Sequence, residues 1–287
     1  MENKIFDKEF FNKLKTMSLQ IKALTEGGQS GVRRSKSKGT SVEFSDFREY
    51  NIGDDIRRID WNAYGRFEKL FIKLFVEEKE ANINIYIDCS KSMDFEEKRE
   101  VTLKISAVVA YLALNNQDKV NINLITRDGI KSEKYSGILS FQRILNFIEK
   151  ETFEGTVKIN NSIKRNKIKS KGLSIIISDF LNEEDIEDSI RFLKYCHQEI
   201  LIINVLSDSE LNPKLNGEVT LVDSESDKKV QLTVTSKILT NYKKALERFT
   251  LNLKNVSQKY GGKLIQVSSN ESIDKIIFDK LFKEGVI

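Results

Sequence analysis

Five oxygen-bearing side chains stand at spacings that could hold a hard metal ion. Residues 88–92 read D-C-S-K-S, a threonine follows in a short E-G-T segment, and a second aspartate ends the run L-S-I-I-I-S-D. The candidate ligands are Asp88, Ser90, Ser92, Thr156 and Asp179. Carboxylate and hydroxyl oxygens suit Mg²⁺, Mn²⁺ or Ca²⁺, so the pattern predicts one ion of this class. A site with so few carboxylates leaves a coordination position open to the carboxylate of a partner.

The elements around these residues predict that they meet at one edge of a sheet. Residues 82–88 alternate between polar and apolar side chains, and residues 173–178 form a continuous apolar run; both are typical of strands. In an open α/β sheet, ligands bind beyond the carboxyl ends of the strands, which is where Asp88 and Asp179 fall. The alternative is structural, because either serine of the first segment could cap a helix beginning near Glu96.

Strand and helix patterns alternate along most of the chain. The further predicted strands are residues 119–126, 200–206 and 263–267, the predicted helices are residues 96–115, 141–149, 183–195, 236–260 and 273–282, and a hairpin is predicted at residues 218–222 and 229–233. This alternation indicates an α/β fold with a mostly parallel sheet and helices on both faces. We expect an N-terminal helical and β extension over residues 1–80 and an α/β domain over residues 81–287.

An amphipathic helix is predicted near the N-terminus, over residues 5–25. Its apolar side chains recur at helical spacing, at Phe10, Leu14, Met17, Ile21 and Leu24. The simplest interpretation is a helix that packs on its own domain, and a helix that binds a partner is the alternative. The basic run at residues 33–38 is typical of a solvated loop.

Residues 41–80 combine charged and aromatic side chains at a density that a plain surface loop does not need. Arg57, Arg58, Trp61 and Arg66 lie in this segment. They are the candidate partner-binding residues, because arginine and tryptophan are frequent anchors of protein interfaces. The alternative is an internal network of salt bridges that fastens the segment to the main domain.

The composition excludes several classes of protein. The chain has 287 residues, of which 39% are hydrophobic and 31% charged, and its net charge of +4 is too small to imply nucleic acid by itself. Its single histidine, His197, excludes a multi-histidine zinc site, and two cysteines, Cys89 and Cys196, make no disulfide framework. The N-terminus lacks a signal-peptide pattern and no apolar stretch is long enough to span a bilayer, so we expect no transmembrane segment and a cytoplasmic location.

Several motifs resemble those of known families. The arrangement DxSxS…T…D resembles the metal-ion-dependent adhesion site of von Willebrand factor A domains. A longer motif resembles the signature of the bacterial domain of unknown function 58 family; it reads E-F-S-D-F-R-E-Y-N-I-G-D-D-I-R-R-I-D-W-N-A-Y-G-R (Glu43–Arg66), followed by K-L-F-I-K-L-F-V-E-E-K-E. A third segment is also similar to that family and reads L-S-D-S-E-L-N-P-K-L-N-G-E-V-T-L-V-D.

The resemblance implies a fold, a site and a role. In that family the C-terminal two-thirds is taken to be a von Willebrand factor A-like domain. The resemblance places Asp88, Ser90 and Ser92 in the first metal-binding loop, Asp179 at the final aspartate and Thr156 in the loop between them. Members commonly neighbour MoxR-type AAA+ ATPases. The implied role is a non-enzymatic adaptor or assembly factor that acts with such an ATPase on a client protein.

Two other functions compete with this interpretation. A divalent-metal-dependent hydrolase could use Asp88 and Asp179 to activate water, although the sequence offers no separate general base and no phosphate loop. A nucleic-acid binder could use residues 33–38 together with Arg57 and Arg58, but the neighbouring aspartates would neutralise the second pair. We therefore expect a protein partner and no nucleic acid.

Overall fold

The computed structural model describes residues 5–26, 42–77, 80–168, 170–181, 185–224 and 228–285. The basic run at residues 33–38 lies outside these ranges. The chain forms two compact units, one made of residues 1–31 and 81–287 and the other of residues 32–80. Each unit is described by itself.

The larger unit is built on a six-stranded sheet with the order β10-β7-β6-β3-β4-β5. The strands are β3 (Asn82–Asp88), β4 (Lys119–Thr126), β5 (Gly129–Tyr135), β6 (Gly172–Ser178), β7 (Gln198–Leu206) and β10 (Lys263–Ser268). All neighbouring pairs are parallel except β4 with β5. Counted along the chain, the strand order is 3-2-1-4-5-6, so the direction of winding reverses between β3 and β6. The predicted mostly parallel α/β fold is confirmed.

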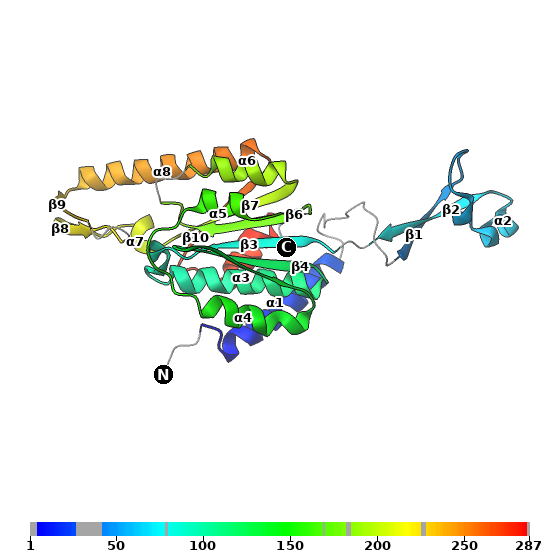
Figure 1. Ribbon diagram of the computed structural model, residues 1–287, viewed down its shortest axis with the longest axis horizontal. Helices are drawn as coiled ribbons and strands as arrows, with labels where there is room; N and C mark the ends of the chain where they lie inside the picture. The colour runs from blue at the N-terminus through cyan, green and yellow to red at the C-terminus, as the bar shows by residue number, and fades with distance from the viewer. Residues whose placement is uncertain are drawn as a thin grey trace. The chain divides into compact units, whose positions relative to one another are not determined.

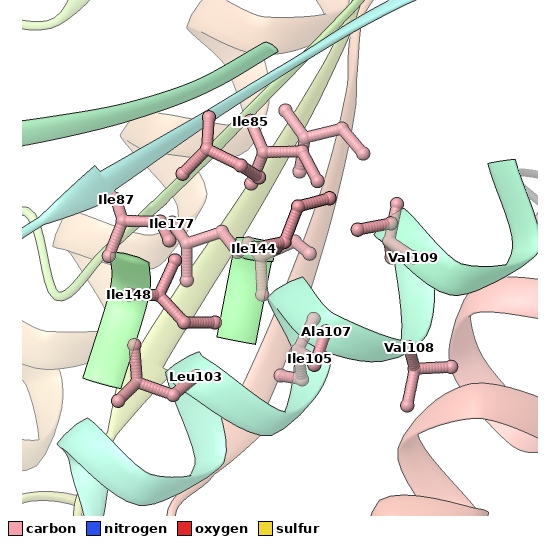
Figure 2. Close-up of a cluster of buried hydrophobic side chains, with 14 of the residues drawn as sticks. Ile85, Ile87, Leu103, Ile105, Ala107, Val108, Val109, Ile144, Ile148 and Ile177 are labelled. Atoms are coloured by element: carbon pink, nitrogen blue, oxygen red, sulfur yellow. The ribbon is translucent and has the colours of Figure 1, made fainter. Parts of the chain in front are cut away.

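Helices cover both faces of this sheet (Figure 1). One face carries α1 (Lys8–Glu26), α3 (Lys98–Asn115) and α4 (Phe141–Glu149), and the other carries α5 (Ile159–Arg165), α6 (Glu187–Tyr195) and α8 (Ser236–Lys259). Figure 2 shows how the first face is filled: Ile85, Ile87 and Ile177 of the sheet meet apolar side chains of α3 and α4. Because α3 is buried almost all round, it is apolar on most sides.

Helix α1 belongs to the larger unit. Phe10, Leu14, Met17 and Ile21 are buried in the same apolar cluster as α3 and α4, whereas the side chain of Leu24 lies outside the described residues. The structure therefore groups this helix with residues 81–287, although the sequence placed it with residues 32–80. The physical reason is its apolar stripe, which is stabilised by burial against a core.

The C-terminal part of the larger unit carries three further elements. The predicted hairpin is present as β8 (Gly217–Val222) and β9 (Lys229–Val234), preceded by the short helix α7 (Asp208–Leu211). The predicted last helix is α9 (Ile273–Lys275) continued by a π-helical segment, Ile276–Phe282. Among the described residues, no helix has the length and apolar character needed to cross a membrane.

In its described residues the smaller unit has a two-stranded sheet, a 3-10 turn (Ile56–Arg58) and an α-helix. Strand β1 (Val42–Glu49) pairs antiparallel with β2 (Phe71–Glu77), and a bulge interrupts the register between Phe44 and Asp46. Helix α2 (Trp61–Phe67) begins after Asp60, whose carboxylate accepts hydrogen bonds from the first turn. Capping of this kind sets the start of the helix.

Candidate metal centre

The sheet brings the two candidate aspartates together. Asp88 ends β3 and Asp179 directly follows β6, and these strands are neighbours, with Ile87 opposite Ile177. Both carboxylates are almost fully buried. They lie at the carboxyl edge of the sheet, between the two strands where the winding reverses, which is the place where open α/β sheets bind ligands.

The first loop is folded around the carboxylate of Asp88. Its Oδ1 accepts a hydrogen bond from the Ser90 backbone N–H at 2.8 Å, and its Oδ2 accepts one from the Ser178 hydroxyl at 2.5 Å. The hydroxyl oxygens of Ser90 and Ser92 are 3.0 Å apart. The D-x-S-x-S segment therefore brings one carboxylate and two hydroxyls together in one small region.

The alternative in which one of these serines caps the following helix is wrong. Helix α3 begins at Lys98 and its N-cap residue is Glu97, which makes no capping hydrogen bond through its side chain. Residues 91–94 form a separate 3-10 turn after Ser90. The serine hydroxyls thus remain beside Asp88 instead of bonding to the backbone of α3.

Electrostatics between the two aspartates favour a positive charge beside them. Burial, and next the negative charge of Asp179, raise the pKa of Asp88 to about 6, although the hydrogen bonds from Ser178 and Ser90 act in the opposite direction. Two buried carboxylates that repel each other are stabilised by a positive charge placed near both.

One positive charge is already built into the site. The ammonium of Lys98, the first residue of α3, is completely buried and lies 3.0 Å from Asp179 Oδ2 and 2.8 Å from Glu210 Oε1. The other oxygen of Asp179 accepts from the Leu181 backbone N–H at 3.1 Å. Lysine therefore fixes the orientation of Asp179 and links it to α7.

Sequence reasoning missed both Lys98 and Glu210. Nothing in the pattern of α3 separates Lys98 from a solvated helix-end lysine. Glu210 did carry a signal: it closes the S-x-x-E capping box at the start of α7, where its Oε2 accepts from the Ser207 N–H at 2.7 Å. Its other oxygen is then directed to the lysine.

The residues present fit one hard divalent cation. Asp88, Asp179 and Glu210 together with Lys98 leave an excess of two negative charges, and Ser90 and Ser92 add neutral oxygen donors. In the part of the chain that the structure describes, no group of three or more His, Cys, Asp or Glu side chains could hold a metal. An ion here would therefore depend on two carboxylates with hydroxyls, a set suited to Mg²⁺ and similar ions.

The loop that contains Thr156 packs on the first loop. The Glu154 N–H donates to the Cys89 carbonyl at 3.0 Å, and the Lys91 N–H donates to the Gly155 carbonyl at 2.9 Å. Gly155 has φ +64°, a conformation that favours glycine. These backbone contacts bring Thr156, which is exposed, to the same edge as Asp88.

The candidate partner-binding residues lie in the smaller unit. Arg57, Arg58, Trp61 and Arg66 are exposed there. The Arg57 guanidinium bonds to nearby Asp55 at 3.2 Å. The Trp61 side chain is 64% exposed and its ring meets the Tyr64 ring edge-on. An exposed tryptophan beside arginines is typical of a binding surface.

An ion pair lies inside the smaller unit, between two of its own residues. Arg48 makes two hydrogen bonds of 2.9 Å to Asp54, which also accepts from the Asn51 backbone N–H. This pair fastens the turn after β1. It includes none of the four candidate residues, although Arg57 forms a separate ion pair with Asp55.

Both cysteines are free, and they lie apart from each other in the fold. Cys89 is buried, and burial raises the pKa of its thiol, so it is an inert core residue. His197 is exposed just before β7, at the amino edge of the sheet, and Cys196 directly follows α6.

Comparison with known proteins gives the family. A model described as "Protein of unknown function DUF58" matches residues 46–250. The chain belongs to this family. In this DUF58 protein the larger unit has the mostly parallel α/β sheet, with helices on both faces, that the sequence predicted.

Relatives and solved structures are similar at low identity. The uncharacterized proteins Rv1480 of Mycobacterium tuberculosis and Mb1516 of Mycobacterium bovis are each 25% identical over 223 residues, which is 74% of this chain and 70% of theirs. The crystal structure of BatB from Bacteroides thetaiotaomicron is 12% identical with a TM-score of 0.45, over 71% of this chain and 98% of that one. The SpRpn10 VWA domain is 12% identical with a TM-score of 0.41, over 70% and 95%.

Proposed function

We propose that this DUF58 protein is a non-enzymatic adaptor that binds another protein through a divalent metal ion at Asp88 and Asp179. The observation that carries the proposal is the excess of two negative charges at the edge of the sheet where Ser90 and Ser92 also place their hydroxyls. An ion that is bound there by few carboxylates of this chain has a free coordination position, which the carboxylate of a partner can fill. The cofactor is Mg²⁺, or Mn²⁺ or Ca²⁺ in its place.

The surroundings of the site support binding over catalysis. Among the described residues, the hydrogen-bond partners of the two aspartates are serine hydroxyls, backbone N–H groups and an ammonium, and each donates to a carboxylate oxygen. His197, the single histidine of the chain, lies at the opposite edge of the sheet, before β7. A hydrolase of this kind would need a general base that is not itself a ligand of the metal.

The partner in this proposal is a MoxR-type AAA+ ATPase together with a client protein, as the family resemblance implies. One carboxylate–metal bond gives direction and little affinity, so other contacts must exclude water. Trp61, Arg57, Arg58 and Arg66 are the candidates for those contacts because they are exposed in the smaller unit.

The test uses the full chain and a purified MoxR-type AAA+ ATPase from the same organism. Complex formation is measured by biolayer interferometry with Mg²⁺ and with excess EDTA, for the wild type and for Asp88→Asn, which keeps the size of the side chain. Asp279→Asn, a change at an exposed aspartate that pairs with Lys283, is the matched control. We expect EDTA and Asp88→Asn each to weaken the complex, and the control to leave it unchanged. A complex of equal strength in all four conditions would remove the metal from the mechanism.

A further inference from the structure

A cavity at the amino edge of the sheet, opposite the edge that carries Asp88, has the features of a second binding site. Its volume is about 290 Å³, close to the lower limit for small-molecule sites. It is lined by Asn82, Asn84, Lys119, Val120, Asn121, Lys134, Tyr135, Ser136, Lys167, Ile168 and Ser170. These residues come from the start of β3 and β4, the end of β5 and the segment after α5.

The sheet under this cavity is polar where a buried sheet is normally apolar. Asn84, Asn121 and Lys134 stand opposite one another in register on β3, β4 and β5. The Asn121 amide donates to Asn84 Oδ1 at 3.1 Å, and the Asn84 amide donates to Gln198 Oε1 at 3.1 Å. Burying carboxamides in place of Val or Ile costs free energy. The hydrogen bonds within the row offset this cost, so the row forms a polar floor to the cavity.

Two further observations indicate what that ligand is. The lining residues include three lysines and no carboxylate, and neither Lys134 nor Lys167 forms an ion pair with another described residue. The Oδ1 atom of Asn121 is buried and has no hydrogen-bond partner within the described part of the chain. The positive charge of the lysines favours an anionic ligand. The unpaired Oδ1 of Asn121 favours a ligand with a hydrogen-bond donor such as a hydroxyl.

We propose that this cavity binds a small soluble phosphorylated polyol, such as a sugar phosphate. Lys134 and Lys167 bind the phosphate by charge-assisted hydrogen bonds. The carboxamides of Asn121 and Asn82, each with donor and acceptor atoms, bind the hydroxyls. A nucleotide fits less well because Tyr135, the single aromatic lining residue, is 3% exposed and offers no free ring face for a base. This site is separate from the metal centre and does not rest on the proposed function.

Calorimetry tests the proposal on the full chain in buffer with EDTA, so that the metal centre plays no part. The probes are glucose 6-phosphate, inorganic phosphate and glucose, together with glycerol 3-phosphate and vesicles of phosphatidylglycerol. We expect glucose 6-phosphate to bind more tightly than phosphate, and glucose and the vesicles not to bind. The double variant Lys134→Gln/Lys167→Gln should weaken glucose 6-phosphate at least about tenfold, and Asn121→Leu should reduce its advantage over phosphate.

The control is Lys150→Gln, a change at an exposed lysine after α4 that does not line the cavity. It should leave the affinity for glucose 6-phosphate unchanged. No binding of either phosphate ester, equal weakening by the control, or binding of the vesicles alone would overturn the proposal. Binding that persists in Asp88→Asn supports a site independent of the metal centre.

Discussion

The ammonium of Lys98 lies 3.0 Å from the carboxylate of Asp179, and both side chains are withdrawn from solvent at the carboxyl edge of the sheet. The same ammonium also bonds to Glu210, so one helix-end lysine joins the aspartate after β6 to the short helix after β7. A protein cation therefore neutralises part of the charge at this edge. A divalent ion at this edge would be attracted by the negative charge that remains.

Replacing Lys98 by methionine should destabilise the fold strongly. The substitution leaves the buried carboxylate of Asp179 unpaired, and loss of one member of a buried pair costs about 3–5 kcal/mol. Chemical denaturation in EDTA measures this loss. Lys104→Met is the control on the same helix, since Lys104 pairs with Glu100 at the surface and should cost less than about 1 kcal/mol. Equal losses in the two variants would show that the Lys98 pair contributes no more than a surface pair.

Metal binding should weaken as the pH falls through about 6, the raised pKa of Asp88. Above this pH the carboxylate is ionised and free to bind a cation; below it, a proton competes with the metal, and the affinity should fall by about tenfold for each pH unit. Titrations with Mn²⁺ at several pH values measure the effect. An affinity that stays constant between about pH 5 and about pH 7 would contradict this prediction.

The carboxyl group of Asp88 should also affect the stability of the metal-free protein, but in the opposite direction. Metal affinity rises with pH, whereas the free energy of unfolding should fall. Since the folded pKa of Asp88 lies above the unfolded value of 3.8, its contribution is present below 3.8 and is lost as the pH rises through about 6. Asp88→Asn should therefore be more stable than the wild type at neutral pH in EDTA, and the difference should shrink in acid. Denaturation curves at two pH values check this, and a variant that is less stable at neutral pH would contradict it.

Asn204 should tolerate replacement by leucine. Its carboxamide is fully buried on β7, opposite Ser178, and neither its nitrogen nor its oxygen has a partner among the described residues. Leucine of similar size removes an unsatisfied polar group, so the free energy of unfolding should rise by about 1 kcal/mol. A loss of stability, or a loss of metal affinity, would instead show that the amide has a partner at this edge, such as an ordered water.

Helix α1 should contribute to the stability of the larger unit. Leu14→Ala removes a side chain that is 2% exposed and should cost about 2–5 kcal/mol. Leu19→Ala on the same helix changes a side chain that is 70% exposed and should stay within about 0.5 kcal/mol of the wild type. Thermal and chemical unfolding compare the two, and similar values would mean that α1 is not part of the core.

The sequence predicted the elements with strong periodicity and missed those whose role is set by distant contacts. Residues 82–88 and 173–178 could be recognised as strands, and the strand-end rule then placed Asp88 beside Asp179. Strand β5 was missed because an edge strand facing solvent is mostly polar, as G-I-K-S-E-K-Y is. Lys98 was missed because its burial depends on Glu210, which is far away in the sequence.

Calorimetric titration of Mg²⁺ or Mn²⁺ into metal-stripped protein tests the central claim most directly. The wild type and the Asp279→Asn control should each bind one ion weakly, because few carboxylates supply the site. Asp88→Asn should lose at least about tenfold in affinity, since it removes one of the two aspartate ligands while keeping the side-chain volume. Equal affinity in Asp88→Asn and the wild type, or no binding of either ion to the wild type, would contradict a metal centre at Asp88 and Asp179.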